Sequence, residues 1–209
     1  MADTYRAADF VSVGEYIPDV LLDVRYYSTY NFVGARIDGY ESPIVLLTRQ
    51  AADALRLVNA DMLSQGYRLV LYDGYRPQRA VDHFARWAED LSADAMKPVF
   101  YPDVDKADLF EQGFIARRSG HSRGSTIDLT LLDAATGQLV DMGGPFDFFG
   151  ELSHPDYAGV TPAQQANRMR LREAMLKHGF KPLSTEWWHF TLRDEPFPVT
   201  YFDFPVREL

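Results

Sequence analysis

SGHSRGSTIDLTLLD, at residues 119–133, is the stretch that decides the fold of this chain. Its first half is rich in Ser and Gly, which is typical of a loop. Its second half alternates Ile127, Leu129 and Leu131 with Asp128 and Thr130, the pattern of a half-buried strand. A carboxylate that faces inward from such a strand needs a cation or several donors to offset its desolvation. The stretch therefore predicts a loop followed by a strand that carries a buried acid.

Helices and strands are predicted on the amino-terminal side of this stretch. Apolar residues recur at helical spacing from Arg49 to Ser64, and Gly66 follows as a plausible stop. A strand is expected from Tyr67 to Tyr72, and the dipeptide Asp73-Gly74 then turns the chain. Pro77 suits the first turn of the next helix. Its buried side is predicted to carry Val81, Phe84, Trp87 and Leu91.

Antiparallel pairing is expected on the carboxyl-terminal side. The segment DAATG, residues 133–137, lies between Leu132 and Leu139 and predicts a hairpin. The segment TPAQ, residues 161–164, has the form of a capping box and predicts a helix up to Gly179. Strands mixed irregularly with helices favour an α+β fold, with an antiparallel sheet flanked by helices.

Length and composition favour one domain over residues 1–209. A chain of 209 residues that is 46% hydrophobic can bury one sizeable core. The sequence has no cysteine, which excludes disulfides and thiolate metal ligands. The net charge of -9 disfavours nucleic acid as a partner, because a nucleic-acid-binding protein needs a basic surface.

A soluble, cytoplasmic protein is the expectation for location. The first ten residues, MADTYRAADF, lack the basic flank and apolar stretch of a secretory signal. No run approaches the roughly 18 apolar residues of a membrane span. We therefore expect neither a membrane nor a secreted location.

A metal site is predicted from His121 and Asp128 together with His189, which lies in the later segment EWWH at residues 186–189. Two imidazoles and one carboxylate leave a fourth position of zinc open for water, as catalytic zinc requires. A single histidine is more often an ordinary hydrogen-bonded side chain. The apolar surroundings of these three residues are better explained by one shared ion, Zn²⁺, than by three separate roles. The other histidines, His83, His154 and His178, are not expected to be ligands.

Glu186 is the candidate general base. It lies three residues before His189, and it could take a proton from the water that the metal activates. Positions three apart share a face on a helix but not on a flat strand. We therefore expect a bend or bulge near Trp187. With a metal and a base, the sequence predicts a hydrolase.

The chain resembles the zinc D-Ala-D-Ala metallopeptidases through the pattern S-x-H-x-x-G-x-x-x-D with a distant E-x-x-H. The segments YDGYRP (72–77), GHSRGS (120–125), DLTL (128–131), FDF (146–148), EWWH (186–189) and LRDEP (192–196) are similar to the D-Ala-D-Ala dipeptidase branch associated with vancomycin resistance. They occur in the expected order over nearly the whole chain. One departure is Thr126, where the wider family commonly has Ala. The added hydroxyl removes no ligand.

The resemblance implies roles for further residues. Arg76 matches the family's catalytic arginine, which would stabilise the oxygen that becomes negative; from residue type alone it would be a surface ion pair. Ser119 and Asp147 match positions that bind the amino terminus of the substrate, although either could be an ordinary loop or cap residue. The substrate carboxylate would be bound by Arg123 or by backbone amides, and Arg123 could instead anchor the ligand loop.

Three functions are compatible with these features. The first is a zinc dipeptidase that cleaves D-Ala-D-Ala to two D-alanines, in a cavity too small for longer peptides. The second is a D,D-carboxypeptidase or endopeptidase that acts on cell-wall peptides with the same metal site. The third is a non-catalytic, zinc-stabilised binding domain, which would require neither Glu186 nor Arg76. The oligomeric state is not predicted.

Overall fold

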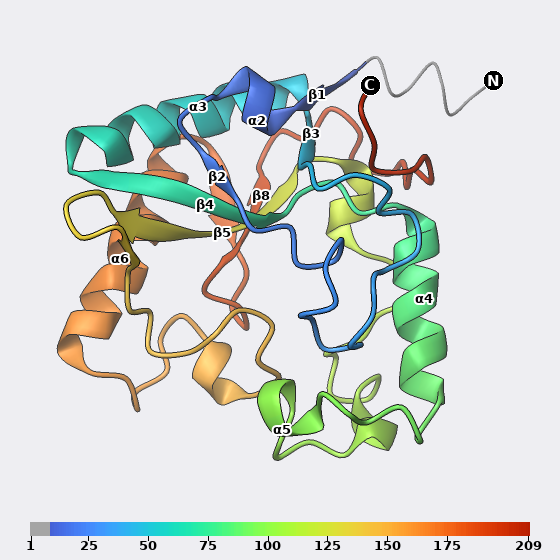
Figure 1. Ribbon diagram of the computed structural model, residues 1–209. Helices are drawn as coiled ribbons and strands as arrows, with labels where there is room; N and C mark the ends of the chain where they lie inside the picture. The colour runs from blue at the N-terminus through green and yellow to red at the C-terminus, as the bar shows by residue number, and fades with distance from the viewer. Residues whose placement is uncertain (1–8) are drawn as a thin grey trace.

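A six-stranded sheet forms the centre of the computed structural model, which describes residues 9–209 (Figure 1). The prediction that the first ten residues are not a secretory signal falls mostly outside the described residues. The strand order is β2-β4-β5-β8-β7, and β6 pairs with β5. The strands are β2 (Leu21–Leu22), β4 (Tyr67–Asp73), β5 (Thr126–Asp133), β6 (Gln138–Leu139), β7 (Phe180–Pro182) and β8 (His189–Leu192).

The sheet is antiparallel except at one edge, so the predicted α+β class is confirmed. The edge strand β2 pairs in parallel with β4, through Leu21 with Val70 and Leu22 with Leu71. A parallel pair needs a long crossover. The chain makes that crossover between residues 23 and 66, a segment that includes the helix α3 (Arg49–Ser64).

A two-stranded sheet leads into α3. β1 (Phe10–Ser12) pairs with β3 (Leu46–Thr48), and the short helix α2 (Val13–Tyr16) follows β1. The Thr48 hydroxyl accepts a hydrogen bond from the Ala51 amide and so caps α3. The helix has the predicted bounds, and Gly66 adopts a φ of 84° just after its end. In Figure 1, α3 lies along β4.

The helix α4 (Gln78–Glu89) starts directly after Pro77, which is its N-cap residue. It buries Val81, Phe84 and Trp87 as predicted. The prediction for Leu91 is wrong, because α4 ends at Glu89 and the Leu91 side chain is 59% exposed. Asp90 accepts hydrogen bonds from the backbone and the hydroxyl of Ser92, which turns the chain away from the helix.

The carboxyl-terminal half also follows the prediction. β5 and β6 form the expected hairpin, in which Leu132 pairs with Leu139. The helix α6 (Pro162–Lys177) begins with a complete capping box between Thr161 and Gln164. α6 packs against β7 and α3. In Figure 1 it passes behind the left end of the sheet.

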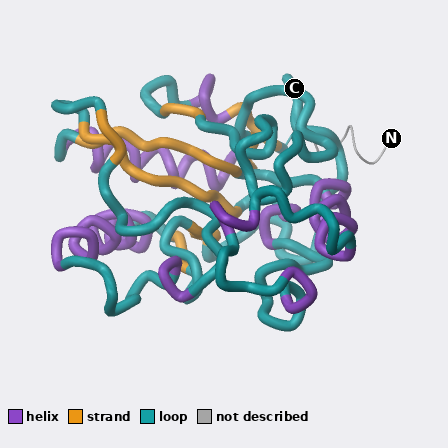
Figure 2. The backbone as a smooth tube through the Cα atoms, turned by 60° about the horizontal axis from the view of Figure 1, so that its bottom comes forward, coloured by secondary structure: helices purple, strands orange, loops and turns teal. Residues whose placement is uncertain are grey.

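Long loops connect these elements and gather beside the sheet (Figure 2). They contain the short helix α5 (Lys97–Phe100) and three 3-10 turns, η1 (Lys106–Asp108), η2 (Gly120–Arg123) and η3 (Glu151–Ser153). Arg168 of α6 is buried and donates to the carbonyl oxygens of Met142, Leu152 and His154 at 2.6–2.8 Å. One guanidinium therefore holds both ends of the loop that contains Asp147.

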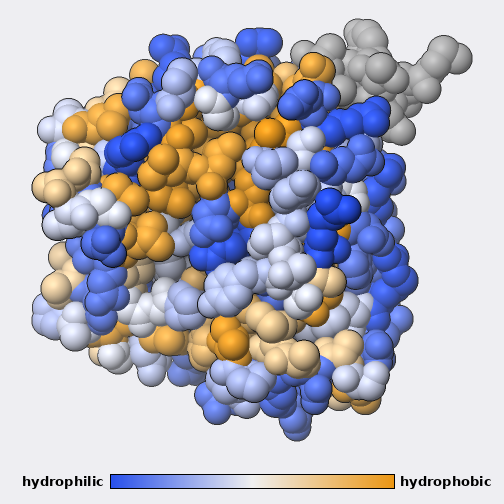
Figure 3. Space-filling view, viewed as in Figure 1, coloured by the Kyte–Doolittle hydropathy of each residue, from blue (hydrophilic) through white to orange (hydrophobic). Residues whose placement is uncertain are grey.

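On the face seen in Figure 3, apolar side chains gather below α3, and hydrophilic side chains line the right side and the margins. None of the helices within residues 9–209 combines the length and the apolar character that crossing a bilayer requires.

Candidate active site

A cavity of about 280 Å³ opens beside the central strands. Its polar lining includes the three predicted metal ligands and the carboxylates of Asp147 and Glu186. Aromatic and aliphatic side chains complete the wall, among them Tyr26, Phe32, Val81, Phe84, Phe114 and Phe149. The cavity therefore combines a compact group of charges with an apolar wall.

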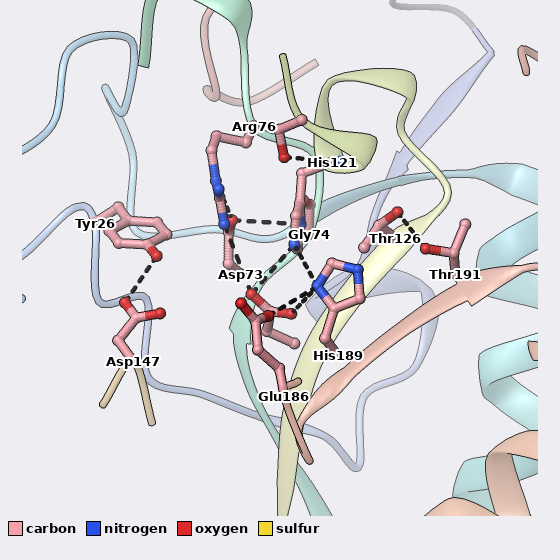
Figure 4. A network of polar contacts seen from close by, with 12 residues as sticks. Tyr26, Asp73, Gly74, Arg76, His121, Thr126, Asp147, Glu186, His189 and Thr191 are labelled. Atoms are coloured by element: carbon pink, nitrogen blue, oxygen red, sulfur yellow. Dashed lines mark hydrogen bonds and ion pairs between the residues drawn. The ribbon is translucent and has the colours of Figure 1, made fainter. Parts of the chain in front are cut away.

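The three predicted metal ligands come together at this cavity. Figure 4 shows two of them, His121 and His189, side by side. Asp128 and His189 are paired residues on the neighbouring strands β5 and β8, and His121 belongs to the 3-10 turn that precedes β5. His189 Nδ1 lies 3.1 Å from Asp128 Oδ1, and His121 Nε2 lies 3.3 Å from both Asp128 Oδ2 and His189 Nδ1. The register of one strand pair thus joins positions that are 61 residues apart in the sequence.

The geometry of these atoms fits a small divalent cation. Ligand atoms about 2.0–2.1 Å from a tetrahedral centre lie about 3.3 Å from one another. The two ring nitrogens are 3.3 Å apart, and each lies 3.1–3.3 Å from a different oxygen of Asp128. The Asp128 Oδ1 atom is buried and accepts no hydrogen bond. Burial lowers the pKa of His189, but Asp128 and Glu186 outweigh burial and raise this pKa to about 9. The site therefore favours positive charge where the three ligands meet.

A backbone carbonyl orients His121. The ring nitrogen Nδ1 lies 2.7 Å from the Gly74 oxygen, so Nδ1 carries the proton and Nε2 presents its lone pair to the cavity. Gly74 lies close to another backbone segment, because a Cβ atom there would be 2.6 Å from the Leu46 oxygen. A residue with a side chain would force these two segments apart and displace the carbonyl that orients His121.

The loop that carries His121 depends on a second glycine. Gly124 adopts a φ of 81°, and a Cβ atom at this position would overlap the ring of Phe10. Its carbonyl accepts a hydrogen bond from the Thr48 amide at 2.8 Å. At the other end of the turn, the Ser119 hydroxyl accepts from the His121 amide at 3.2 Å. Ser119 therefore caps η2 and also lines the cavity.

Glu186 lies beside the ligands but is not one of the three. Its Oε2 atom lies 3.3 Å from His189 Nδ1, and its side chain is 36% exposed. β8 begins only at His189, and the chain turns at Trp187 and Trp188, which is the bend that the sequence predicts. This bend lets Glu186 reach the same cavity as His189.

Arg76 lies at the junction of β4 and α4 and points into the cavity (Figure 4). Its Nη2 atom is 3.7 Å from Asp128 Oδ2, and its amide donates to the His121 oxygen at 3.3 Å. Arg76 Nε donates to Asp73 Oδ2 at 2.9 Å, and Tyr40 donates to the other Asp73 oxygen at 2.6 Å. The arginine is therefore fixed by a buried ion pair.

Asp73, predicted from the sequence as a turn residue, is part of the site. Asp73 is 1% exposed and lies opposite Asp128 in the β4–β5 ladder, next to an irregularity in the register. Its Oδ2 atom also lies 3.5 Å from His121 Nδ1. The one signal in the sequence was an acid three residues before Arg76, and that spacing alone does not distinguish a buried pair from a turn.

Asp147 lines the same cavity and is held by Tyr26, a residue that no sequence pattern indicated. The Tyr26 hydroxyl donates to Asp147 Oδ2 at 2.8 Å, and both residues are buried. Asp147 has a φ of 61°, the only left-handed non-glycine residue among residues 9–209. Burial, and then the charge of Asp128, raise its pKa well above the ordinary value. An ammonium group would offset both effects.

The structure pairs Arg123 with an internal carboxylate. Its guanidinium donates two hydrogen bonds of 2.8 Å to the two carboxylate oxygens of Glu195, and it does not line the cavity. A guanidinium in a two-point pair with an internal carboxylate is not available to a substrate. Arg123 instead ties the ligand loop to the carboxyl-terminal segment, the alternative that the sequence left open.

The hydroxyl of Thr126 has a partner on the neighbouring strand. Its Oγ1 atom lies 2.9 Å from Oγ1 of Thr191, and both residues are buried. The pair joins β5 to β8 two residues from Asp128 and His189 in the same ladder. The hydroxyl that distinguishes Thr126 from Ala is therefore hydrogen-bonded in the interior.

The remaining histidines lie elsewhere. His178 bonds to Asp61, and His83 accepts from the Asp38 amide. His121, Asp128 and His189 form the one group of three or more such side chains within residues 9–209 that could hold a metal ion.

Comparison with known proteins agrees with this geometry. A family model described as D-ala-D-ala dipeptidase matches residues 6–207. The D-alanyl-D-alanine dipeptidase of Enterococcus faecium is 43% identical over 198 residues, which cover 95% of this chain and 98% of that protein. The dipeptidase of Streptomyces coelicolor is also 43% identical over the same shares of each chain, and that of Escherichia coli is 36% identical over 92% of this chain and 87% of its own length. This chain belongs to the D-Ala-D-Ala dipeptidase family of metallopeptidases.

Proposed function

We propose that this protein hydrolyses D-Ala-D-Ala to two molecules of D-alanine, with one Zn²⁺ held by His121, Asp128 and His189. The observation that carries the proposal is the convergence of these three residues at one cavity, beside the carboxylate of Glu186, which is not one of the three. Nitrogen and oxygen ligands at tetrahedral spacing are compatible with zinc. When bound, zinc supplies Lewis-acid polarisation of the scissile carbonyl and lowers the pKa of water.

Glu186 acts as the general base in this proposal. Its carboxylate accepts a proton from the attacking water as the water oxygen bonds to the scissile carbonyl carbon. The same proton then passes from Glu186 to the amide nitrogen as the carbon–nitrogen bond breaks. The partial exposure of Glu186 and its position outside the group of three ligands leave its carboxylate free to carry this proton.

Arg76 stabilises the negative charge that develops on the carbonyl oxygen. Its guanidinium is held by Asp73 and lies over the rings of Tyr26 and Phe84, with its central carbon 4.9 and 5.3 Å from the ring centres. A donor that is fixed before the reaction needs no reorganisation when the charge appears. This arrangement supports a role in transition-state binding for Arg76.

Asp147 binds the ammonium group of the substrate, and Ser119 contributes from the loop before His121. Asp147 is buried, and Tyr26 fixes one of its oxygens. A buried carboxylate gains most from a cationic partner, because that partner offsets its desolvation. The substrate ammonium would therefore lower the raised pKa of Asp147 and select peptides with a free amino terminus.

The small cavity supports a dipeptide over a longer peptide as the substrate. A volume of about 280 Å³ is near the lower end of the range for small-molecule sites. The further parts of the proposal are that residues 1–209 act as one domain and that the enzyme works in the cytoplasm. A sequence without cysteine is compatible with a reducing compartment.

A substrate panel with the zinc-loaded protein tests the proposed function. It contains D-Ala-D-Ala, L-Ala-L-Ala, an N-acylated D,D-dipeptide and a pentapeptide that ends in D-Ala-D-Ala, and the assay measures release of free alanine. We expect cleavage of the free D,D-dipeptide alone. Cleavage of the blocked or longer peptides would indicate a carboxypeptidase or endopeptidase. A protein that binds one zinc but cleaves none of the four would be a non-catalytic binding domain.

A further inference from the structure

A second arginine, Arg118, lines the cavity together with Arg76. Arg76 forms an ion pair with Asp73 and lies near Asp128. Arg118 is exposed at the cavity and forms no ion pair with any acid among residues 9–209. Its guanidinium carbon lies 5.0 Å from the ring centre of Tyr201, which positions the side chain through a cation–π contact. Arg118 is thus a positioned cation without an anionic partner.

The charges of the cavity leave one requirement of a dipeptide unmet. Asp128, Asp147 and Glu186 provide three carboxylates, which suit a metal ion, an ammonium group and a proton. A free dipeptide also carries a carboxylate, and a closed pocket has to pair that charge. Arg123 does not meet this need, because Glu195 occupies its guanidinium. Of the arginines that line the cavity, Arg118 is the one without an internal carboxylate.

We propose that Arg118 binds the carboxyl-terminal carboxylate of the substrate and makes the enzyme select peptides with a free carboxyl end. The proposal rests on the proposed dipeptidase function and adds a specificity-determining residue to it. A guanidinium presents two parallel N–H groups that match the two oxygens of a carboxylate. A carboxyl-terminal amide offers one oxygen and no charge, so it loses most of this interaction.

The position of Arg118 in the chain is suitable for this role. It lies three residues before His121, and the intervening Ser119 and Gly120 also line the cavity. In a dipeptide, only three bonds separate the carboxylate carbon from the scissile carbonyl carbon. A carboxylate-binding group must therefore be close to a metal ligand in space. A long side chain next to the η2 turn meets this condition.

The test compares D-Ala-D-Ala with its carboxyl-terminal amide in the zinc-loaded, full-length protein. For Arg118→Ala we expect kcat/KM for the free dipeptide to fall roughly 10- to 100-fold, as expected for loss of a hydrogen-bonded charge pair. The loss should lie mainly in KM, whereas kcat/KM for the amide should change less than about threefold. Arg118→Lys, which keeps the charge but not the two-point geometry, should lie between the wild type and Arg118→Ala.

Arg117→Ala is the matched control. Arg117 is the adjacent residue, but it is paired with Glu89, is 71% exposed and does not line the cavity. This variant should keep the wild-type preference for the acid over the amide. An equal loss on both substrates in Arg118→Ala would mean a structural role and would overturn the proposal. An unchanged kcat/KM for the free dipeptide would overturn it as well.

A binding measurement separates this proposal from the proposed function. Isothermal titration of the two ligands into Glu186→Ala and into Glu186→Ala/Arg118→Ala reports affinity without turnover. We expect the first protein to prefer the acid and the second to bind acid and amide equally. If the wild type cleaves neither substrate, the proposed dipeptidase function is wrong. In that case, loss of the preference for the acid in Glu186→Ala/Arg118→Ala would still support carboxylate binding by Arg118. If Glu186→Ala itself shows no preference for the acid, the role of Arg118 is wrong.

Discussion

The hydroxyl groups of Thr126 and Thr191 lie 2.9 Å apart across β5 and β8, two residues along the same ladder from Asp128 and His189. Both threonines are buried, so each hydroxyl depends on the other for its hydrogen bond. The pair therefore helps to fix the register that places two of the three candidate metal ligands opposite each other.

Replacing one threonine should cost more than replacing both. Thr126→Ala leaves the Thr191 hydroxyl buried without this partner, and we expect a loss of about 1–3 kcal/mol in the free energy of unfolding. In Thr126→Ala/Thr191→Val both hydroxyls are absent, and most of that loss should be recovered. Urea denaturation of the metal-free proteins measures the difference. Additive effects of Thr126→Ala and Thr191→Val would show that the two hydroxyls are not coupled.

Substitutions of Glu186 and of His189 should have different effects on the zinc content of the protein. Glu186→Ala should keep one zinc per chain and lose turnover, because the base is absent but the three ligands remain. His189→Ala should lose zinc, because two ligands hold the ion weakly. Elemental analysis after gel filtration measures the metal, and release of D-alanine measures turnover. Near wild-type activity in Glu186→Ala would exclude this residue as the base, and a full zinc content in His189→Ala would remove that residue from the site.

Asp73 should act on turnover through Arg76. Asp73→Asn keeps the size of the side chain but removes the charge that holds Arg76 Nε at 2.9 Å. Loss of a donor to the developing negative charge typically costs about 10²-fold or more, which we expect for Arg76→Ala. Asp73→Asn should lower kcat by a smaller factor. The double variant should be no worse than Arg76→Ala alone, because both changes remove one interaction.

Zinc content is the control for the Asp73 measurement, because Asp73 also lies 3.5 Å from His121 Nδ1. Rates should be compared at saturating zinc, so that a weaker affinity for the metal does not lower kcat. Fully additive effects of Asp73→Asn and Arg76→Ala would contradict a role of Asp73 through Arg76.

Gly124 should be far more sensitive to substitution than Gly137. Both residues have a positive φ, 81° and 69°, which costs about 1–2 kcal/mol for a residue with a side chain. A Cβ atom at Gly137 would meet open space, whereas one at Gly124 would overlap Phe10. We expect Gly137→Ala to show the backbone cost alone and Gly124→Ala to lose additional stability. Equal losses in thermal unfolding would mean that the contact with Phe10 relaxes freely.

The ion pairs of Asp61 should make stability depend on pH in the acidic range. Asp61 on α3 accepts from Lys177 and His178 at the end of α6, each at 2.7 Å. The hydrogen bond from Lys177, and then that from His178, lower the pKa of Asp61 below its ordinary value. A lowered pKa in the folded state contributes stability above the unfolded pKa, and this stability is lost as the pH falls through the folded pKa.

The comparison of wild type with Asp61→Asn isolates this contribution. The difference in unfolding free energy should be constant from about pH 6 to pH 5 and should shrink below the ordinary pKa of about 3.9 for Asp. Urea denaturation at a series of pH values measures it. A difference that grows on acidification would have the wrong sign for the proposed ion pairs.

Much of the fold was predictable from local patterns. The bounds of α3, the capping box of α6 and the hairpin of β5 with β6 follow from apolar periodicity and turn residues. The error at Leu91 arose because apolar periodicity continued past Glu89, whereas the local hydrogen bonds of Asp90 ended the helix. Side chains such as that of Asp90 compete with helix formation by bonding to nearby backbone groups. This competition is hard to recognise in a sequence, but here it ends the helix.

The sequence by itself determined which atoms could form a metal site, because no cysteine is present and His121, Asp128 and His189 stand in apolar or loop surroundings. Only the tertiary structure decided the partners of the arginines. It pairs Arg76 with Asp73 and Arg123 with Glu195. It places Arg118 at the cavity with no acidic partner within the described part of the chain, residues 9–209. The physical reason is that an ion pair depends on distance in space. Strand register and loop packing set that distance between residues far apart in the chain, and local sequence patterns do not encode it.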